Sequence, residues 1–214
     1  MSLRKLRAID HALGLLDTAL AGGGFEGPGA GRESPAATLE DTPLSTHDRL
    51  DVAGMMRVNH TGEVCAQALY LGQAAVARNE RTRSQLLAAA GEELDHLNWC
   101  QHRLDQLQAQ PSLFNPLWYA GSFAIGAGAA FFGDRVSLGF VVETERQVEA
   151  HLGEHLERMP LRDQRSRAIV ATMQREEAEH GANAQAAGGV ELPALVKRMM
   201  AFSAGVMKAV AYRI

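Results

Sequence analysis

The sequence predicts an all-α protein: a bundle of four long helices with a long apolar crossover and an additional amphipathic helix at the C-terminus. From Thr46 onward alanine, leucine, glutamine, glutamate and arginine dominate, and no stretch alternates β-branched residues as a strand would. Apolar residues recur there at spacings of three and four, the period of a helix with one buried face. Between Pro111 and Gly133 no residue is charged, which distinguishes the crossover from the helices around it.

The pattern places six helical segments in one domain over 46–214. A mainly apolar segment covers 115–132, between the second and third long helices. A final helix follows Pro193, because proline suits a first helical turn. The four long helices are predicted at 47–78, 82–109, 134–159 and 162–187.

Two segments precede this domain. Residues 22–45 are rich in glycine, proline and serine without a periodic apolar face, which predicts a flexible linker. Residues 1–21 are expected to form a short amphipathic helix. Asp10 and Asp17 interrupt its apolar stretch, so no cleavable secretory signal is evident.

Composition excludes some classes of function. The net charge is −4 and the basic residues are scattered, which argues against nucleic acid as a partner. The only two cysteines, Cys65 and Cys100, have neither disulfide-scaffold nor zinc-site spacing, which fits a reducing compartment.

Each long helix carries a glutamate in the middle of its apolar row, on the face expected in the core. Two of these glutamates are followed three residues later by a histidine, giving Glu-x-x-His. In chain order the core residues are Glu63, Glu93 with His96, Glu145, and Glu177 with His180.

Four buried carboxylates need positive partners, since an unpaired buried charge costs several kcal/mol. No lysine or arginine lies in these rows, so two divalent metal ions are the predicted partners, with one imidazole for each. Glu145 is chosen over Glu143 because it shares a helical face with Val142 and Val148. The order Glu, then Glu-x-x-His, occurs twice and predicts two helical hairpins. This ligand set with a long crossover is typical of ferritin-like di-iron and di-manganese bundles.

One rival motif is His151-x-x-Glu154-His155, which matches a zinc-peptidase pattern. Only 59 residues follow it, and no strand is available to hold an extended peptide. His151 and His155 are instead expected near the end of the bundle or on its surface.

The stretch Asn59-His60-Thr61-Gly62-Glu63 is similar to a signature of the demethoxyubiquinone hydroxylases, the di-iron monooxygenases of ubiquinone biosynthesis. The likeness covers about residues 45–214 and assigns the iron ligands to the same six residues. His151 also matches a family histidine near the site, and Glu149 and Tyr70 are expected to support the ligands. Gly126 and Gly128 are expected to let the substrate pass close to the backbone. The other stretches that resemble the family are Glu93-Leu94-Asp95-His96, Pro116-Leu117-Trp118, Ala124-Ile125-Gly126-Ala127-Gly128 and Glu177-Ala178-Glu179-His180.

The resemblance implies a reaction and its cofactors. Two iron ions and dioxygen would hydroxylate the ring of a polyprenyl methoxy-methyl-benzoquinol, demethoxyubiquinol, and the second oxygen atom would leave as water. The two electrons required could come from the quinol, from NADH or from a protein partner. A ferritin-like iron-storage or oxidase protein is the main alternative.

A polyprenyl substrate implies contact with a membrane. The apolar segment 113–132 and the last helix are the expected contact elements, the latter with Lys197, Arg198, Lys208 and Arg213 on one side. Its other side is expected to be apolar, with Met199, Met200, Val206, Met207 and Val210. We expect a peripheral protein on the cytoplasmic face of the cell membrane, as a homo-oligomer or with a partner in a ubiquinone-biosynthesis complex.

Overall fold

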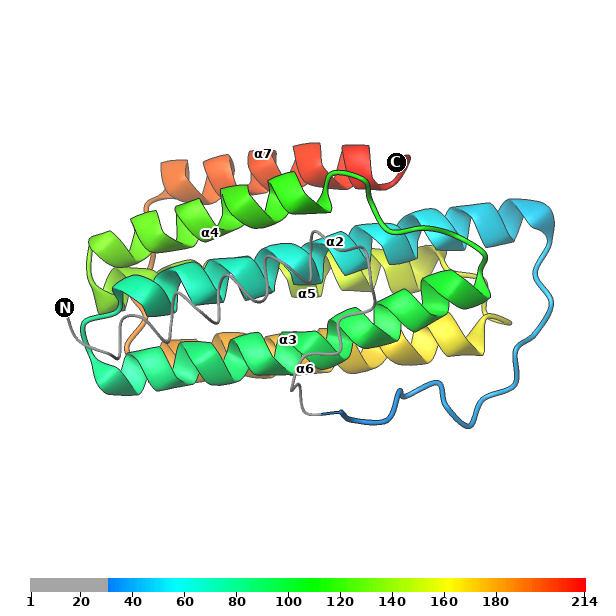
Figure 1. Ribbon diagram of the computed structural model, residues 1–214, viewed down its shortest axis with the longest axis horizontal. Coiled ribbons are helices and arrows are strands. Elements are labelled where there is room, and N and C mark those ends of the chain that lie inside the picture. Colours follow the sequence, from blue (N-terminus) through cyan, green and yellow to red (C-terminus); the bar gives the residue numbers. More distant parts are fainter. Residues whose placement is uncertain (1–30) are drawn as a thin grey trace.

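The computed structural model describes residues 31–214, and every regular element in this range is a helix (Figure 1). The predicted all-α class is therefore confirmed. All six predicted segments are helical, with ends within a few residues of those expected. In chain order they are α2 (Thr46–Val76), α3 (Glu80–Gln106), α4 (Asn115–Phe131), α5 (Asp134–Arg158), α6 (Gln164–Ala186) and α7 (Ala194–Ala211).

The helices form a ferritin-like bundle, as predicted. Helices α2 and α3 pack as one hairpin and α5 and α6 as the other, while α4 is the crossover between them and lies along α2. Helix α7 packs on α2 and α5. Consequently α4 and α7 both cover the outer side of the bundle, along its upper edge in Figure 1.

Polar caps explain why three of the long helices begin where they do. The side chains of Ser45, Asn79 and Asp163 accept hydrogen bonds from the first-turn amides of α2, α3 and α6. Pro116 lies in the first turn of α4, and Pro193 directly precedes α7.

Helix α4 approaches α2 unusually closely. A Cβ atom added at Gly126 would lie 2.1 Å from the carbonyl oxygen of Leu69, and one added at Gly72 would lie 2.2 Å from that of Phe123. Only glycine fits such a backbone contact. The two glycines therefore set the position of the crossover against the bundle.

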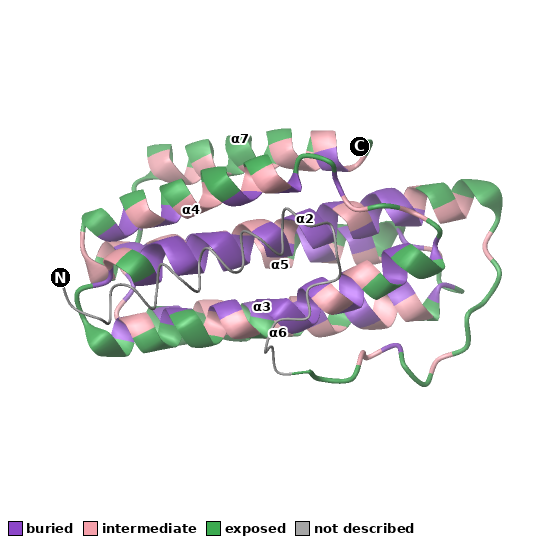
Figure 2. Ribbon diagram, in the orientation of Figure 1, coloured by how far each residue is buried: buried purple, intermediate pink, exposed green. Residues whose placement is uncertain are grey.

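The core has two apolar clusters on either side of a polar layer. One cluster includes Leu69, Leu86 and Leu138, and the other includes Met56, Leu104 and Leu152. On α2, α5 and α6 the predicted metal ligands fall between the residues of the two clusters. Figure 2 shows the buried inner faces of the bundle and the extensive exposed surface on α4 and α7.

The predicted helix at 1–21 and the first part of the predicted linker lie outside the described residues. Residues 31–45 contain a turn at 35–38 and no helix. Ala36 packs into the second apolar cluster, and Asp41 pairs with the buried Arg103. This part of the chain therefore packs against the bundle before α2 begins.

Candidate metal centre

The structure brings all six predicted ligands together in the middle of the bundle. They form two groups, each with ligand atoms within 4.8 Å of one another. Glu93 and Glu177 belong to both groups, so these two glutamates could bridge a pair of metal ions. The groups are Glu63, Glu93, His96 and Glu177, and Glu93, Glu145, Glu177 and His180.

The two histidines point the same ring nitrogen at the centre. His96 Nδ1 is 3.1 Å from Glu177 Oε1 and 3.2 Å from Glu93 Oε2. His180 Nδ1 is 3.1 Å from Glu177 Oε2 and 3.4 Å from Glu93 Oε1. Each metal position would thus have one terminal glutamate, two shared glutamates and one imidazole, a set of oxygen and nitrogen donors that suits iron.

Burial dominates the electrostatics. It raises the pKa values of Glu63 and Glu145 well above the usual range for a glutamate, with neighbouring carboxylates adding to the effect. Burial also opposes ionisation of Glu93, but hydrogen bonds with His180 and His96 outweigh it and lower the pKa of Glu93. Against the cost of burial, contacts with the glutamates raise the pKa of His180 to about 12. The cluster therefore strongly favours positive charge at its centre.

Two oxygen atoms of one predicted ligand lack a hydrogen-bond partner. Both carboxylate oxygens of Glu145 are buried, and neither has a partner among residues 31–214. Buried polar atoms of this kind are uncommon and call for an explanation. Metal ions between the carboxylates would satisfy them, so the residues fit a dinuclear metal site. Glu143 instead pairs with Arg146.

Most of the chain matches a known protein family. A model of the family described as "Ubiquinone biosynthesis protein COQ7" matches residues 51–211. This match spans all six predicted ligands and most of the chain. The chain belongs to the COQ7 family.

Curated proteins similar to this chain carry the name 3-demethoxyubiquinol 3-hydroxylase. The protein from Xanthomonas axonopodis pv. citri (strain 306) is 58% identical over 190 residues, covering 89% of this chain and 88% of the relative. The protein from Ralstonia pickettii (strain 12J) is 60% identical over 173 residues, covering 81% and 80% of the two chains. The predicted family is thereby confirmed.

Two glutamates of this COQ7-family site were not predicted. Glu176 Oε2 is 2.8 Å from His96 Nε2, and Glu92 Oε2 is 2.7 Å from His180 Nε2. Each glutamate directly precedes a predicted ligand and contacts the histidine of the opposite hairpin. Such a carboxylate fixes the orientation of a metal-ligating imidazole. The pattern Glu-Glu-x-x-His, which occurs twice in the sequence, could have identified both glutamates.

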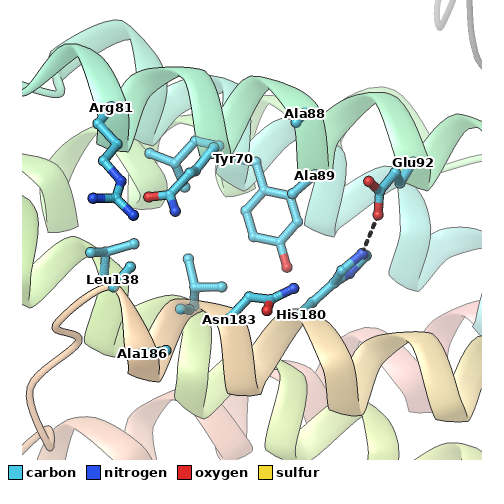
Figure 3. A pocket seen from close by; sticks show the side chains of 14 residues that line it. Tyr70, Arg81, Ala88, Ala89, Glu92, Leu138, His180, Asn183 and Ala186 are labelled. Atoms are coloured by element: carbon cyan, nitrogen blue, oxygen red, sulfur yellow. Dashed lines mark hydrogen bonds and ion pairs between the residues drawn. The ribbon is translucent and has the colours of Figure 1, made fainter.

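Tyr70, which was expected to support the ligands, lines a pocket together with one of them, His180. It is fully buried, and its hydroxyl has no hydrogen-bond partner among the described residues. Figure 3 shows this hydroxyl pointing towards Asn183 and His180, in a pocket of about 370 Å³ that Arg81 and Glu92 also line. The pocket connects the His180 side of the site with the surface between α3 and α6.

The histidines of the rival peptidase motif are buried, so a place on the surface was wrong, although His155 does lie in the last turn of α5, near the end of the bundle. His151 Nε2 and His155 Nδ1 lie 3.2 and 2.8 Å from the same atom, Asn59 Oδ1. This shared amide, one helical turn before Glu63, explains the burial. Glu154 is exposed. Among the described residues, the side chains that could hold a metal ion all lie in the Glu63–His180 site.

The buried histidine pair makes a prediction about acid stability. Burial and nearby positive charge lower the pKa of His151 to about 3 and that of His155 to about 4. In the unfolded chain both would titrate at about 6.5. The two neutral histidines therefore make their full contribution to the free energy of unfolding above that pH. This contribution is lost as the pH falls towards 4. The free energy of unfolding should fall by up to about 1.4 kcal/mol per pH unit for each histidine.

Urea unfolding between pH 7 and pH 4.5 measures this effect. The variant His155→Gln can still hydrogen-bond Asn59 but cannot take up a proton, so its stability should depend less steeply on pH than that of wild type. Acid-induced metal loss contributes to both proteins and cancels in the difference. Equal slopes would contradict the prediction.

Three predicted positions remain, namely Glu149, Gly126 and Gly128, and their surroundings differ. Glu149 is half-buried, and its carbonyl accepts a hydrogen bond from Gln174. The packing of α4 on α2 already accounts for Gly126. A Cβ atom added at Gly128 would meet nothing within 4 Å, so a passage for substrate remains a prediction there.

Proposed function

We propose that this chain is an oxygen-dependent di-iron monooxygenase that hydroxylates the ring of demethoxyubiquinol in ubiquinone biosynthesis. The observation that carries the proposal is the pair of ligand groups that share Glu93 and Glu177. Membership of the COQ7 family and the names of its curated relatives point to the same reaction.

The six ligands would hold two iron ions, which supply the activation of dioxygen when bound. Glu63 and His96 would hold one ion, Glu145 and His180 the other, and the shared Glu93 and Glu177 would contribute to both. Glu176 and Glu92 hold the outer nitrogens of the two imidazoles, so that their inner nitrogens face the ions. The apolar clusters on either side keep bulk water from the reacting ring.

The substrate is proposed to enter from a membrane surface that α4 and α7 contact. Large apolar side chains are exposed on both helices, and Phe132 and Phe202 are each 76% exposed. A soluble surface seldom exposes this much apolar area without a partner. The exposed set is Leu117, Ile125, Phe131 and Phe132 at α4, and Leu195, Met199, Phe202 and Val206 on α7.

Helix α7 fits the surface of an anionic membrane. Met200, Met207 and Val210, expected on the same face as Met199 and Val206, are half-buried towards the bundle. The exposed stripe is therefore narrower than predicted, with Arg198 beside it. Within residues 31–214 we find no helix with the length and hydropathy needed to cross a bilayer. Peripheral binding at the anionic cytoplasmic face is our proposal.

Complementation tests the proposed reaction. Cells that lack their own demethoxyubiquinol hydroxylase should regain ubiquinone when they express this chain, and the demethoxy precursor should fall. Quinones are measured by mass spectrometry, and metal analysis with a Mössbauer spectrum should give about two iron ions per chain. Zinc at one ion per chain after iron-replete expression would contradict the di-iron site. Iron uptake without ubiquinone would favour the storage alternative.

A further inference from the structure

The segment before α2 reaches the metal centre through Arg32, which precedes the residues that the family match covers. The guanidinium of Arg32 joins two helices. Its Nε lies 2.6 Å from Asp95 Oδ2 on α3, and its two terminal nitrogens each lie 3.0 Å from one carboxylate oxygen of Glu176 on α6. The Arg32 amide also donates to Asp95 Oδ1. These contacts form a two-pronged arrangement that an arginine side chain holds rigidly.

Trp99 also contacts Arg32. The Trp99 indole N–H donates to the carbonyl oxygen of Arg32, and the Arg32 guanidinium carbon lies 4.8 Å from the centre of the indole ring. The same indole ring lies next to His96, at 5.3 Å between ring centres. Trp99 is 3% exposed, so the stack cannot shift without disturbing the core.

Glu176 connects this clamp to a predicted ligand. Its Oε2 atom contacts both an Arg32 nitrogen, at 3.0 Å, and His96 Nε2, at 2.8 Å. Because both oxygens of Glu176 accept from Arg32, rotation of the carboxylate away from His96 would also break its contacts with Arg32. The other ring nitrogen of His96, Nδ1, then points towards Glu63, Glu93 and Glu177.

The equivalent contact in the other half has no such clamp. Glu92 holds His180 Nε2, but its side chain is 53% exposed. Among the ion pairs of residues 31–214, none joins Glu92 to a lysine or arginine. The pocket of Figure 3 also opens beside this pair. The two halves have the same ligand types but differ in how firmly the histidine is held.

We propose that Arg32 is a positioning residue that holds His96 through Glu176, making the His96 metal position the more firmly held of the two. The inference rests on the proposed metal pair. It follows that an iron ion at the His180 position exchanges first, through the pocket between α3 and α6. An iron ion at the His96 position exchanges more slowly.

Iron release to an excess of a ferrous chelator tests this inference. The dithionite-reduced wild-type protein should release its iron in a fast and a slow phase. Arg32→Ala should accelerate the slow phase by about tenfold, the lower end of the effect of removing a partner of a metal-ligating histidine. The fast phase should keep its rate. Arg32→Lys should accelerate the slow phase less than Arg32→Ala does. It should not restore the wild-type rate, because a single ammonium group cannot bind both carboxylates.

Two controls separate positioning from general loosening. Arg165 anchors the same segment by donating to the Leu39 carbonyl, away from Glu176, so Arg165→Ala should leave both phases unchanged. In a Glu176→Gln background, Arg32→Ala should have almost no further effect. An unchanged slow phase in Arg32→Ala, equal acceleration of both phases, or a full effect of Arg32→Ala in the Glu176→Gln background would overturn the inference. Wild-type protein that binds no iron would overturn the metal pair as well.

Discussion

Replacing Glu177 with alanine should remove both iron ions and lower hydroxylation by more than about 100-fold. Glu177 is 1% exposed and belongs to both ligand groups, so its loss leaves each position with only three protein ligands. Loss of a supporting hydrogen-bond partner already costs about 10–100-fold, and loss of a shared ligand should cost more. Iron per chain and hydroxylated quinol are the two measurements.

Matched variants make this result specific. Glu179→Ala makes the same change at an exposed position of the same helix and should keep both iron and activity. Glu63 belongs to one group only, so Glu63→Ala should retain about one iron per chain while losing activity. If Glu177→Ala still hydroxylated at the wild-type rate, the proposed catalytic site would be wrong.

Reversing the basic charges of α7 should weaken binding to anionic vesicles by about 100-fold. The variant carries glutamate at Lys197, Arg198 and Lys208. Each basic residue near an anionic surface contributes about 1 kcal/mol, so three together contribute about 3 kcal/mol. Flotation with vesicles of phosphatidylglycerol and phosphatidylcholine measures the change. The fold should persist, because within residues 31–214 these three side chains form a single ion pair, between Lys197 and Glu191, and Glu191 is 86% exposed.

A second charge reversal serves as the control. Glutamate at Arg81, Arg165 and Arg175 changes the net charge equally, but on α3 and α6 instead of the α4–α7 side. This variant should float as wild type does, apart from a small effect of net charge. Equal losses for the two variants would show that α7 has no special contact with the membrane.

The sequence was enough to predict which four glutamates and two histidines come together in the core, because burial and helical period act together on them. Burying an unpaired carboxylate costs free energy, so each of the four glutamates on a core face required a positively charged partner. The helical period placed His96 and His180 on the same faces as Glu93 and Glu177. Register also distinguished Glu145 from Glu143, and in the structure Glu143 faces Arg146 instead.

What the sequence did not predict depends on contacts between distant segments. Arg32 lies in a stretch rich in glycine and proline, where no period indicates a partner, and it meets residues 63 and 144 positions away. The burial of His151 and His155 similarly depends on Asn59, more than 90 positions earlier. Gly126 was assigned to substrate, whereas the backbone of Leu69 explains why it is glycine.

The sharing of Glu93 and Glu177 has a mechanical consequence. Each metal position takes ligands from both hairpins, since Glu177 of α6 completes the group around His96 and Glu93 of α3 completes the group around His180. Bound ions would therefore act as a cross-link between halves of the molecule that are far apart in sequence. Pulling the hairpins apart would require breaking metal–ligand bonds first. Opening of the bundle would then require prior loss of the ions, and the iron-loaded chain would resist proteolysis for as long as it kept them.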